Sequence, residues 1–174
     1  MKAIVYTTNT GSTAQYAKML AEETGLPAFS AGEAKSKVAP GSEVIYFGWI
    51  MASKVKGFDS VAKKYNVRAV CAVGMEKSGT RAEEIRGKSC VPAEIPLFTL
   101  QGNFDVKKLR GIYRIMMNLM VKIVSKQLGE KKELTDREEE ILSAMLHGGE
   151  NVKAENLKPV LEWFSKEGRN EQKY

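Results

Sequence analysis

The pattern of apolar and polar positions predicts a chain in which short buried strands alternate with helices. Apolar runs bounded by turn residues lie at 2–6, 28–31, 43–48, 67–74 and 95–100. Continuous runs of this length are typical of strands covered on both faces, as in a parallel sheet. Helical spacing marks 14–25, 58–65, part of 75–87, 106–127, 135–146 and 157–166, whereas 32–41 and 49–57 are predicted to be loops.

Strands that alternate with helices predict βαβ units, and right-handed crossovers then give a three-layer α/β/α sandwich with five parallel strands. Ligands of such sheets bind beyond the carboxyl ends of the strands. The loops expected at that edge are 8–13, 49–54, 74–79 and 101–104. No repeat or linker interrupts the chain, so we expect one domain over 1–174, with 106–150 as a helical insertion after the last strand.

The composition is ordinary for a soluble globular domain, with 43% apolar and 28% charged residues among 174. The first residues already belong to a predicted strand and no apolar run reaches membrane-spanning length, so a cytoplasmic protein is expected. Cys71 and Cys90 lack metal or redox spacing and are expected to be a core residue and a free thiol. The net charge of +6 favours acidic partners or anionic membranes but is too small to indicate nucleic acid.

The first predicted strand passes into a turn of small hydroxyl and amide residues that precedes a helix. Such a turn directs backbone N–H groups and the positive end of the helix dipole at one spot, which suits a phosphate. The turn contains no Lys or Arg and matches neither common nucleotide-binding glycine pattern. Neutral donors can enclose a monophosphate, and the candidates are Thr8, Asn9, Thr10, Gly11, Ser12 and Thr13. The alternative is an ordinary loop with a Ser or Thr N-cap.

The segment Ile4-Val5-Tyr6-x-Thr8-x-x-Gly11-x-Thr13-x-x-x-Ala17 is similar, nearly position for position, to the N-terminal signature of flavodoxins. It departs at Lys18, where that signature usually has an aliphatic residue. The resemblance implies a flavodoxin-like sheet in strand order 2-1-3-4-5 and an FMN cofactor whose phosphate the first loop would bind. It also implies that the loops after the third and fourth strands flank the flavin ring. The implied ring contacts are Trp49, Ile50, Met51, Ala52, Ser53, Gly74, Met75, Glu76 and Lys77.

Trp49 has two interpretations from the sequence. It can provide a flat apolar wall for a flavin ring, or it can be a core residue that caps the sheet. Met51 and Met75 belong to a residue type that more often packs than contacts a ligand.

Residues for catalysis without a cofactor are missing from the sequence. His147 is the only histidine, at a predicted helix end, so a catalytic triad or a histidine metal site has no support. The turn after the first strand also lacks the acidic residues of receiver domains and the Cys-x5-Arg loop of low-molecular-weight tyrosine phosphatases. Redox chemistry would therefore come from a cofactor, and neither catalytic residues nor metal ligands are predicted.

The predicted helix over 106–127 combines a broad apolar face, which includes Met116 and Met120, with many basic residues. It either packs on the sheet with a solvated basic side, or makes a peripheral contact with an anionic membrane or an acidic partner. With 48–58 and 100–105, it looks like the flavodoxin-like branch that includes bacterial protoporphyrinogen oxidases, which use quinones. That branch has Arg and Gly where Met51 and Ser53 stand here.

The sequence therefore predicts an FMN-binding, flavodoxin-like redox protein, an oxidoreductase or electron carrier in the cytoplasm or on a membrane surface. The resemblance implies a redox partner protein, a quinone or another small molecule as the partner, and no nucleic acid is expected. The alternative is a non-catalytic binding or regulatory module with the same fold and no flavin turnover.

Overall fold

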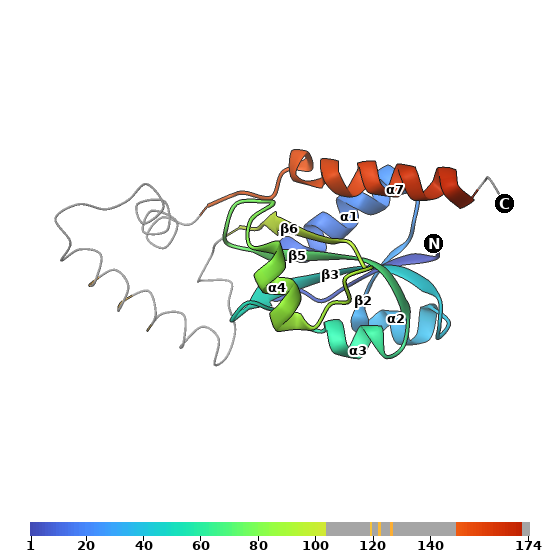
Figure 1. Cartoon of the computed structure of the whole chain (residues 1–174), viewed down its shortest axis with the longest axis horizontal. Coiled ribbons are helices and arrows are strands. Elements are labelled where there is room, and N and C mark those ends of the chain that lie inside the picture. The colour runs from blue at the N-terminus through green and yellow to red at the C-terminus, as the bar shows by residue number, and fades with distance from the viewer. Residues whose placement is uncertain (104–118, 120–121, 123–125, 127–148, 172–174) are drawn as a thin grey trace. The chain divides into compact units, whose positions relative to one another are not determined.

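The computed structural model describes residues 1–103, 119, 122, 126 and 149–171 (Figure 1). The chain divides into two compact units, Met1–Gly102 with Val152–Tyr174, and Asn103–Asn151. The first unit contains the sheet. The helices predicted over 106–127 and 135–146 lie almost entirely outside the described residues, and the single domain over 1–174 remains a prediction.

The sheet of the first unit has the predicted order. Five parallel strands are arranged as β2-β1-β3-β5-β6, which is 2-1-3-4-5 among the strands predicted from the sequence. Their bounds are β1 (Ala3–Tyr6), β2 (Ala28–Ser30), β3 (Glu43–Met51), β5 (Asn66–Gly74) and β6 (Leu97–Gln101). The three-layer α/β/α sandwich with flavodoxin-like topology is thus confirmed.

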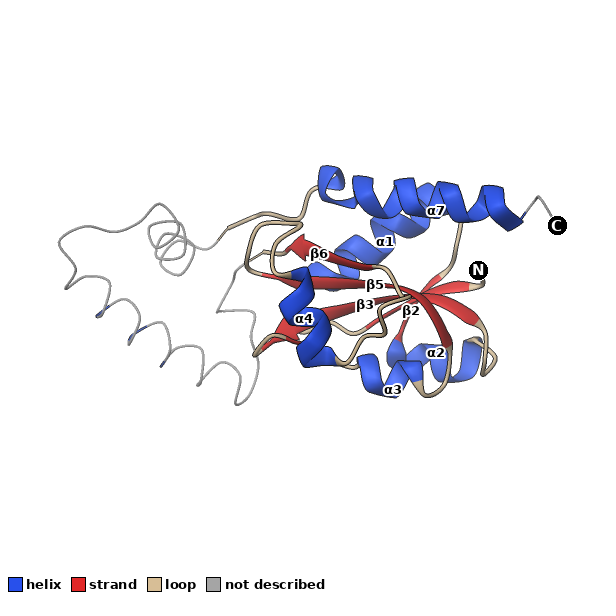
Figure 2. Cartoon of the chain, viewed as in Figure 1, coloured by secondary structure: helices blue, strands red, loops and turns tan. Residues whose placement is uncertain are grey.

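Helices cover both faces of this sheet (Figures 1 and 2). On one face lie α1 (Ser12–Thr24), the short 3₁₀ helix η2 (Ala154–Leu157) and α7 (Lys158–Glu171); on the other lie α2 (Ala31–Lys37), α3 (Phe58–Ala62) and α4 (Ala82–Ser89). Neighbouring residues of a strand point to opposite faces, so Ile4 is buried in one core cluster and Val5 in the other. This two-sided burial explains the continuous apolar runs.

The prediction of a loop over 32–41 is wrong, because α2 occupies much of it. Ser30 caps this helix by accepting a hydrogen bond from the Glu33 N–H at 3.3 Å, and the Glu33 carboxylate accepts one from the Ser30 N–H at 3.0 Å. This reciprocal pair is a capping box. Only Ala34 of α2 is buried, so the helix leaves almost no apolar periodicity in the sequence.

The prediction of a loop over 49–57 is also wrong. Strand β3 continues to Met51, turns through Ala52 and Ser53, and returns as β4 (Lys54–Val55), which pairs with it antiparallel. Both turn residues have positive φ, 49° and 60°. Tight hairpins with this conformation favour Asn-Gly, and other residues are strained there by on the order of 1 kcal/mol each. Ala-Ser therefore gives no hairpin signal in the sequence.

Cys71 is buried in β5, as expected for a core residue, and Cys90 is an exposed free thiol after α4. In the described part of the chain, no helix has both the length and the apolar character needed to cross a membrane.

A substitution at Gly48 in β3 tests how closely β4 and the residue after it pack against this strand. A Cβ at this position would lie 2.5 Å from Val55 Cγ1 and 2.9 Å from the Lys56 carbonyl oxygen. Overpacking of this kind costs about 1–3 kcal/mol, so we expect Gly48→Ala to lower the free energy of unfolding by that amount in urea titrations.

Gly87→Ala is the matched control, because a Cβ at Gly87 in α4 would meet no atom within 4 Å. We expect Gly87→Ala to be neutral or to stabilise by up to about 1 kcal/mol, since alanine favours the helix. Equal stability of Gly48→Ala and the unmodified protein would contradict the packing described for the hairpin.

Candidate functional site

The loop between β1 and α1 begins at an anchored residue, Thr7. Its N–H donates to the Phe47 carbonyl oxygen at 2.9 Å, and its hydroxyl lies 2.6 Å from the hydroxyl of the buried Tyr46. Both hydroxyls also reach the Lys56 carbonyl oxygen, at 2.8 and 2.5 Å. Burial raises the pKa of Tyr46 to about 12, so this hydroxyl stays protonated and can donate throughout the physiological range. The start of the loop is thereby fixed to β3 and to the end of the hairpin.

The predicted phosphate residues lie at the carboxyl edge, at the start of α1. Gly11, with φ of 101°, is the N-cap of α1, and its N–H donates to Thr8 Oγ1 at 3.1 Å. No side chain caps the helix and its first turn contains no acidic residue, so the alternative of a Ser or Thr N-cap is not what the structure shows. Ser12 and Thr13 are buried in that first turn. A helix that starts in this way retains an N-terminus suited to an anion.

Asn9 in the same loop has a polar atom without a partner. Its amide nitrogen Nδ2 is buried, and no hydrogen-bond acceptor reaches it among the described residues. Leaving a donor unsatisfied in this way costs roughly 1–3 kcal/mol. An oxygen of a phosphate bound at the loop could accept this bond, so Asn9 fits the chemistry of a neutral phosphate site.

Loops from three strands meet beside this turn. The N–H of Gly102, just after β6, donates to the Gly74 carbonyl oxygen at the end of β5 at 2.6 Å. A Cβ at Gly102 would lie 3.2 Å from Ser12 Cβ, and a Cβ at Gly74 would lie 2.9 Å from Ile50 Cδ1. The expected gathering of the loops after β1, β3, β5 and β6 is confirmed for these residues, whereas Phe104 lies outside the described residues.

Three of the predicted ring contacts lie in a strand and not in the loop predicted to follow it. Trp49, Ile50 and Met51 are the last residues of β3 and are partly buried. Ile50 packs against the core cluster beneath α2, α3 and α4, so its side chain serves packing. Strand alternation places Trp49 on the opposite face, the face of Phe47 and α1. Trp49 is only partly buried, so it does not belong to the closed core, and its role at a ring stays a prediction.

The other predicted ring contacts lie in turns. Ala52 and Ser53 form the tip of the hairpin, Gly74 ends β5, and Met75, Glu76 and Lys77 follow in the loop to α4. Met75 is 44% exposed, an unusual exposure for a large apolar side chain of this unit. The loop is tied to β6, because the Gly79 N–H donates to the Thr99 carbonyl oxygen at 3.0 Å and Ser78 Oγ accepts from the Gln101 N–H at 2.9 Å.

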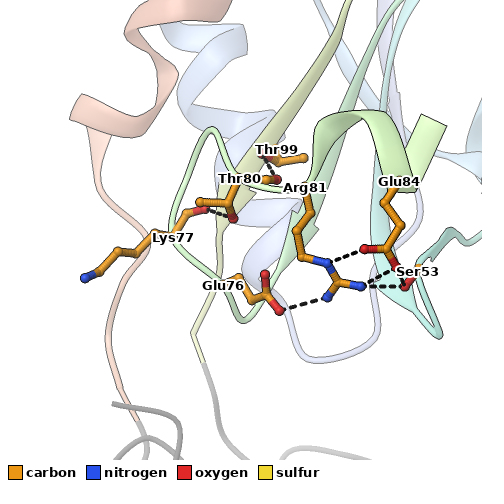
Figure 3. Close-up of polar contacts among 7 residues, drawn as sticks. All are labelled: Ser53, Glu76, Lys77, Thr80, Arg81, Glu84 and Thr99. Carbon is orange, nitrogen blue, oxygen red and sulfur yellow. Dashed lines mark hydrogen bonds and ion pairs between the residues drawn. The ribbon is translucent and has the colours of Figure 1, made fainter. Parts of the chain in front are cut away.

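An ion-pair cluster around Arg81, which sequence reasoning missed, joins the hairpin to this loop (Figure 3). The guanidinium binds Glu84 in α4 through two nitrogens and Glu76 through a third at 2.8 Å, and it also donates to Ser53 Oγ at 2.9 Å. The Arg81 and Ser53 hydrogen bonds lower the pKa of Glu84 to about 2, and the two carboxylates raise the pKa of Arg81. Lys77 points away from the cluster (Figure 3).

The predicted membrane-contacting helix and His147 belong to the second unit, Asn103–Asn151. Of the predicted helix 106–127, the structure describes Leu119, Lys122 and Lys126, all of which are helical and exposed, Leu119 to 59%. Membrane contact through this segment stays a prediction, and His147 lies outside the described residues. No group of three or more potential metal ligands occurs among the residues that the structure describes.

Comparisons with models of protein families, with curated proteins and with solved structures find no match. The chemical interpretation of the carboxyl edge therefore rests on its own geometry and on the resemblance of the first loop.

The pKa of Glu84 depends chiefly on its hydrogen bonds with Arg81, so a substitution of Arg81 should change it. We expect Arg81→Gln to raise the pKa of Glu84 from about 2 toward the ordinary value of 4.5, measured by carboxyl ¹³C NMR. Because the folded pKa is depressed, Glu84 stabilises the fold above its unfolded pKa, and this contribution disappears as the pH falls through about 2. The variant should lose most of this acid dependence, because only the weaker influence of Ser53 and Lys88 remains.

Glu33 provides an internal control in the same spectra. Its pKa is lowered by hydrogen bonds from Ser30 and not by Arg81, so it should titrate alike in both proteins. A Glu84 carboxyl that still titrates near pH 2 in the variant would contradict the assigned contacts.

Proposed function

We propose that the carboxyl edge of the sheet binds FMN and that the protein acts through this flavin as a redox protein, either an oxidoreductase or an electron carrier. The observation that carries the proposal is the start of α1. Its cap is a glycine, its first turn has no acidic residue, and the neighbouring Asn9 Nδ2 is buried without an acceptor. These features favour an anion held by neutral donors.

The first loop would hold the phosphate. Candidate donors are the side chains of Asn9 and Thr10 and the backbone N–H groups of the first turn of α1. The loop contains no Lys or Arg, so binding would depend on donors held in position and on the helix dipole. The anchoring of Thr7 on Tyr46 supports this reading, because it fixes the loop before any ligand arrives.

The hairpin and the loop after β5 would flank the ring. Trp49 at the end of β3 and the exposed Met75 just after β5 offer apolar surface, and the two strands adjoin there because Trp49 is paired with Val73 in the sheet. Bound FMN would supply one- or two-electron transfer, and the role of these residues would be to bind and orient the ring and to limit its contact with water.

The protein or small molecule that exchanges electrons with the flavin would carry negative charge. Lys54 and Lys56 are exposed on the hairpin, beside the proposed ring site, and the chain as a whole has a net charge of +6. A positive rim of this kind speeds encounters with acidic redox proteins or anionic small molecules. The alternative, a module without flavin turnover, is an outcome of the test below.

Visible absorption tests the proposal directly. We expect protein mixed with FMN and passed through gel filtration to elute with a flavin spectrum in near-stoichiometric amount. Protein that elutes without flavin, while far-UV circular dichroism shows it folded, would contradict FMN binding and favour the non-catalytic module. With FMN retained, reduction of the flavin and its reoxidation by a quinone would distinguish turnover from simple binding.

Asn9→Asp tests the phosphate loop in particular. The substitution keeps the side-chain shape but replaces a donor with a carboxylate that repels phosphate. A hydrogen bond to a charged group contributes about 1.5–3 kcal/mol, so we expect the Kd for FMN to rise by at least about tenfold. Asn66→Asp makes the same change at the exposed start of β5, on the opposite edge of the sheet, and should leave the Kd unchanged. Equal affinities of the two variants would mean that the phosphate binds elsewhere.

A further inference from the structure

One guanidinium joins three segments of the carboxyl edge. Arg81 Nη2 donates to Ser53 at the tip of the β3–β4 hairpin, Nη1 to Glu76 in the loop after β5, and Nε to Glu84 in α4 (Figure 3). Ser53 Oγ also donates to Glu84 Oε1 at 2.8 Å, which closes the network. The hairpin tip is thereby bonded to both neighbours through side chains alone.

The backbone on both sides of this contact is strained. Ser53 and Arg81 have φ of 60° and 55°, in the left-handed region that side chains other than glycine avoid. Such conformations persist only where surrounding interactions determine them, and they collect at sites where precise placement matters. At Arg81, which immediately precedes α4, this conformation accompanies a guanidinium directed back at the hairpin rather than along the helix.

The base of the hairpin is held independently. The Val55 N–H donates to Ser89 Oγ at 2.9 Å, and the Lys56 N–H donates to the Trp49 carbonyl oxygen at 2.9 Å. The Lys56 carbonyl oxygen is bonded in turn by Thr7 and Tyr46. Loss of the Arg81 contacts would leave the tip held through side chains only by the Ser53–Glu84 hydrogen bond. The tip over residues 51–54 should therefore loosen while the base stays in place.

We propose that Arg81 is a positioning residue that clamps the tip of the β3–β4 hairpin against the loop after β5 and so fixes the two walls of the flavin-ring site. This inference rests on the proposed function for its consequence in flavin binding. The clamp itself does not require FMN, because all of its contacts are made within the protein. A preorganised wall favours binding, since the loop need not be ordered when the ligand arrives.

Hydrogen exchange of the FMN-free protein tests the clamp. We expect Arg81→Gln to speed amide exchange at residues 51–54 by about tenfold, while the amides of Val55 and Lys56 keep their protection. Lys63→Gln is the control, because it removes the same charge from the exposed end of α3. It should leave the exchange of the hairpin unchanged. Unaltered exchange at 51–54 in Arg81→Gln would overturn the clamp.

Flavin affinity tests the positioning role. We expect Arg81→Gln to raise the Kd for FMN by about tenfold, with no change in Lys63→Gln. The cluster holds one guanidinium and two carboxylates, a net charge of −1, so Arg81→Gln changes it to −2 and addition of Glu84→Gln restores −1. If the double variant regains the affinity, charge alone explains the effect and the positioning role is overturned. If FMN binding by the double variant stays weak, loss of the Arg81 clamp is responsible.

The two proposals fail in distinguishable ways. If the unmodified protein does not bind FMN, the proposed function fails, and the exchange experiment still decides whether Arg81 clamps the hairpin. If the tip is freed in Arg81→Gln but the Kd for FMN is unchanged, the positioning role is overturned while FMN binding stands.

Discussion

The arrangement of the loops at the carboxyl edge depends on the hydrogen bonds of the Tyr46 hydroxyl. Tyr46 is fully buried in β3, so its hydroxyl must find partners inside the protein, and it finds them in Thr7 and the Lys56 carbonyl oxygen. One partner starts the loop after β1 and the other ends the hairpin. Gly57 makes this approach possible, because it has φ of 87° and a Cβ there would collide with the hydroxyl. A single polar group in an apolar layer thus sets the spacing between the first loop and the hairpin.

The sequence predicted the elements that bury many side chains and missed those that bury few. Strands β1 and β5 were predictable because helices cover both of their faces, which requires continuous apolar runs. Helix α2 buries Ala34 and strand β4 buries Val55, so neither leaves a periodic pattern. The capping box of Ser30 and Glu33 was the available signal for α2.

Of the candidate site, likewise, one part could be predicted from the sequence and another could not. The position of the first loop followed from topology, since the carboxyl ends of parallel strands share one edge. The Arg81 cluster could not be predicted, because it joins residues 28 apart in sequence through a hairpin whose turn, Ala52-Ser53, has no turn-forming sequence. The unsatisfied amide of Asn9 is likewise a property of packing, which no local pattern encodes.

Under the proposed function, the first loop would hold an anion without a cation of its own. Glu76 and Glu84 would oppose the approach of a phosphate, but both are bound to the guanidinium of Arg81, which offsets one of their two charges. The first loop has no charged side chain of its own. Under the proposed function, affinity for the phosphate would then come from fixed dipoles and amide donors. Because fixed donors at short range are screened less by salt than exposed ion pairs are, binding should depend more on the geometry of the loop than on ionic strength. The buried contact between Tyr46 and Thr7 maintains that geometry.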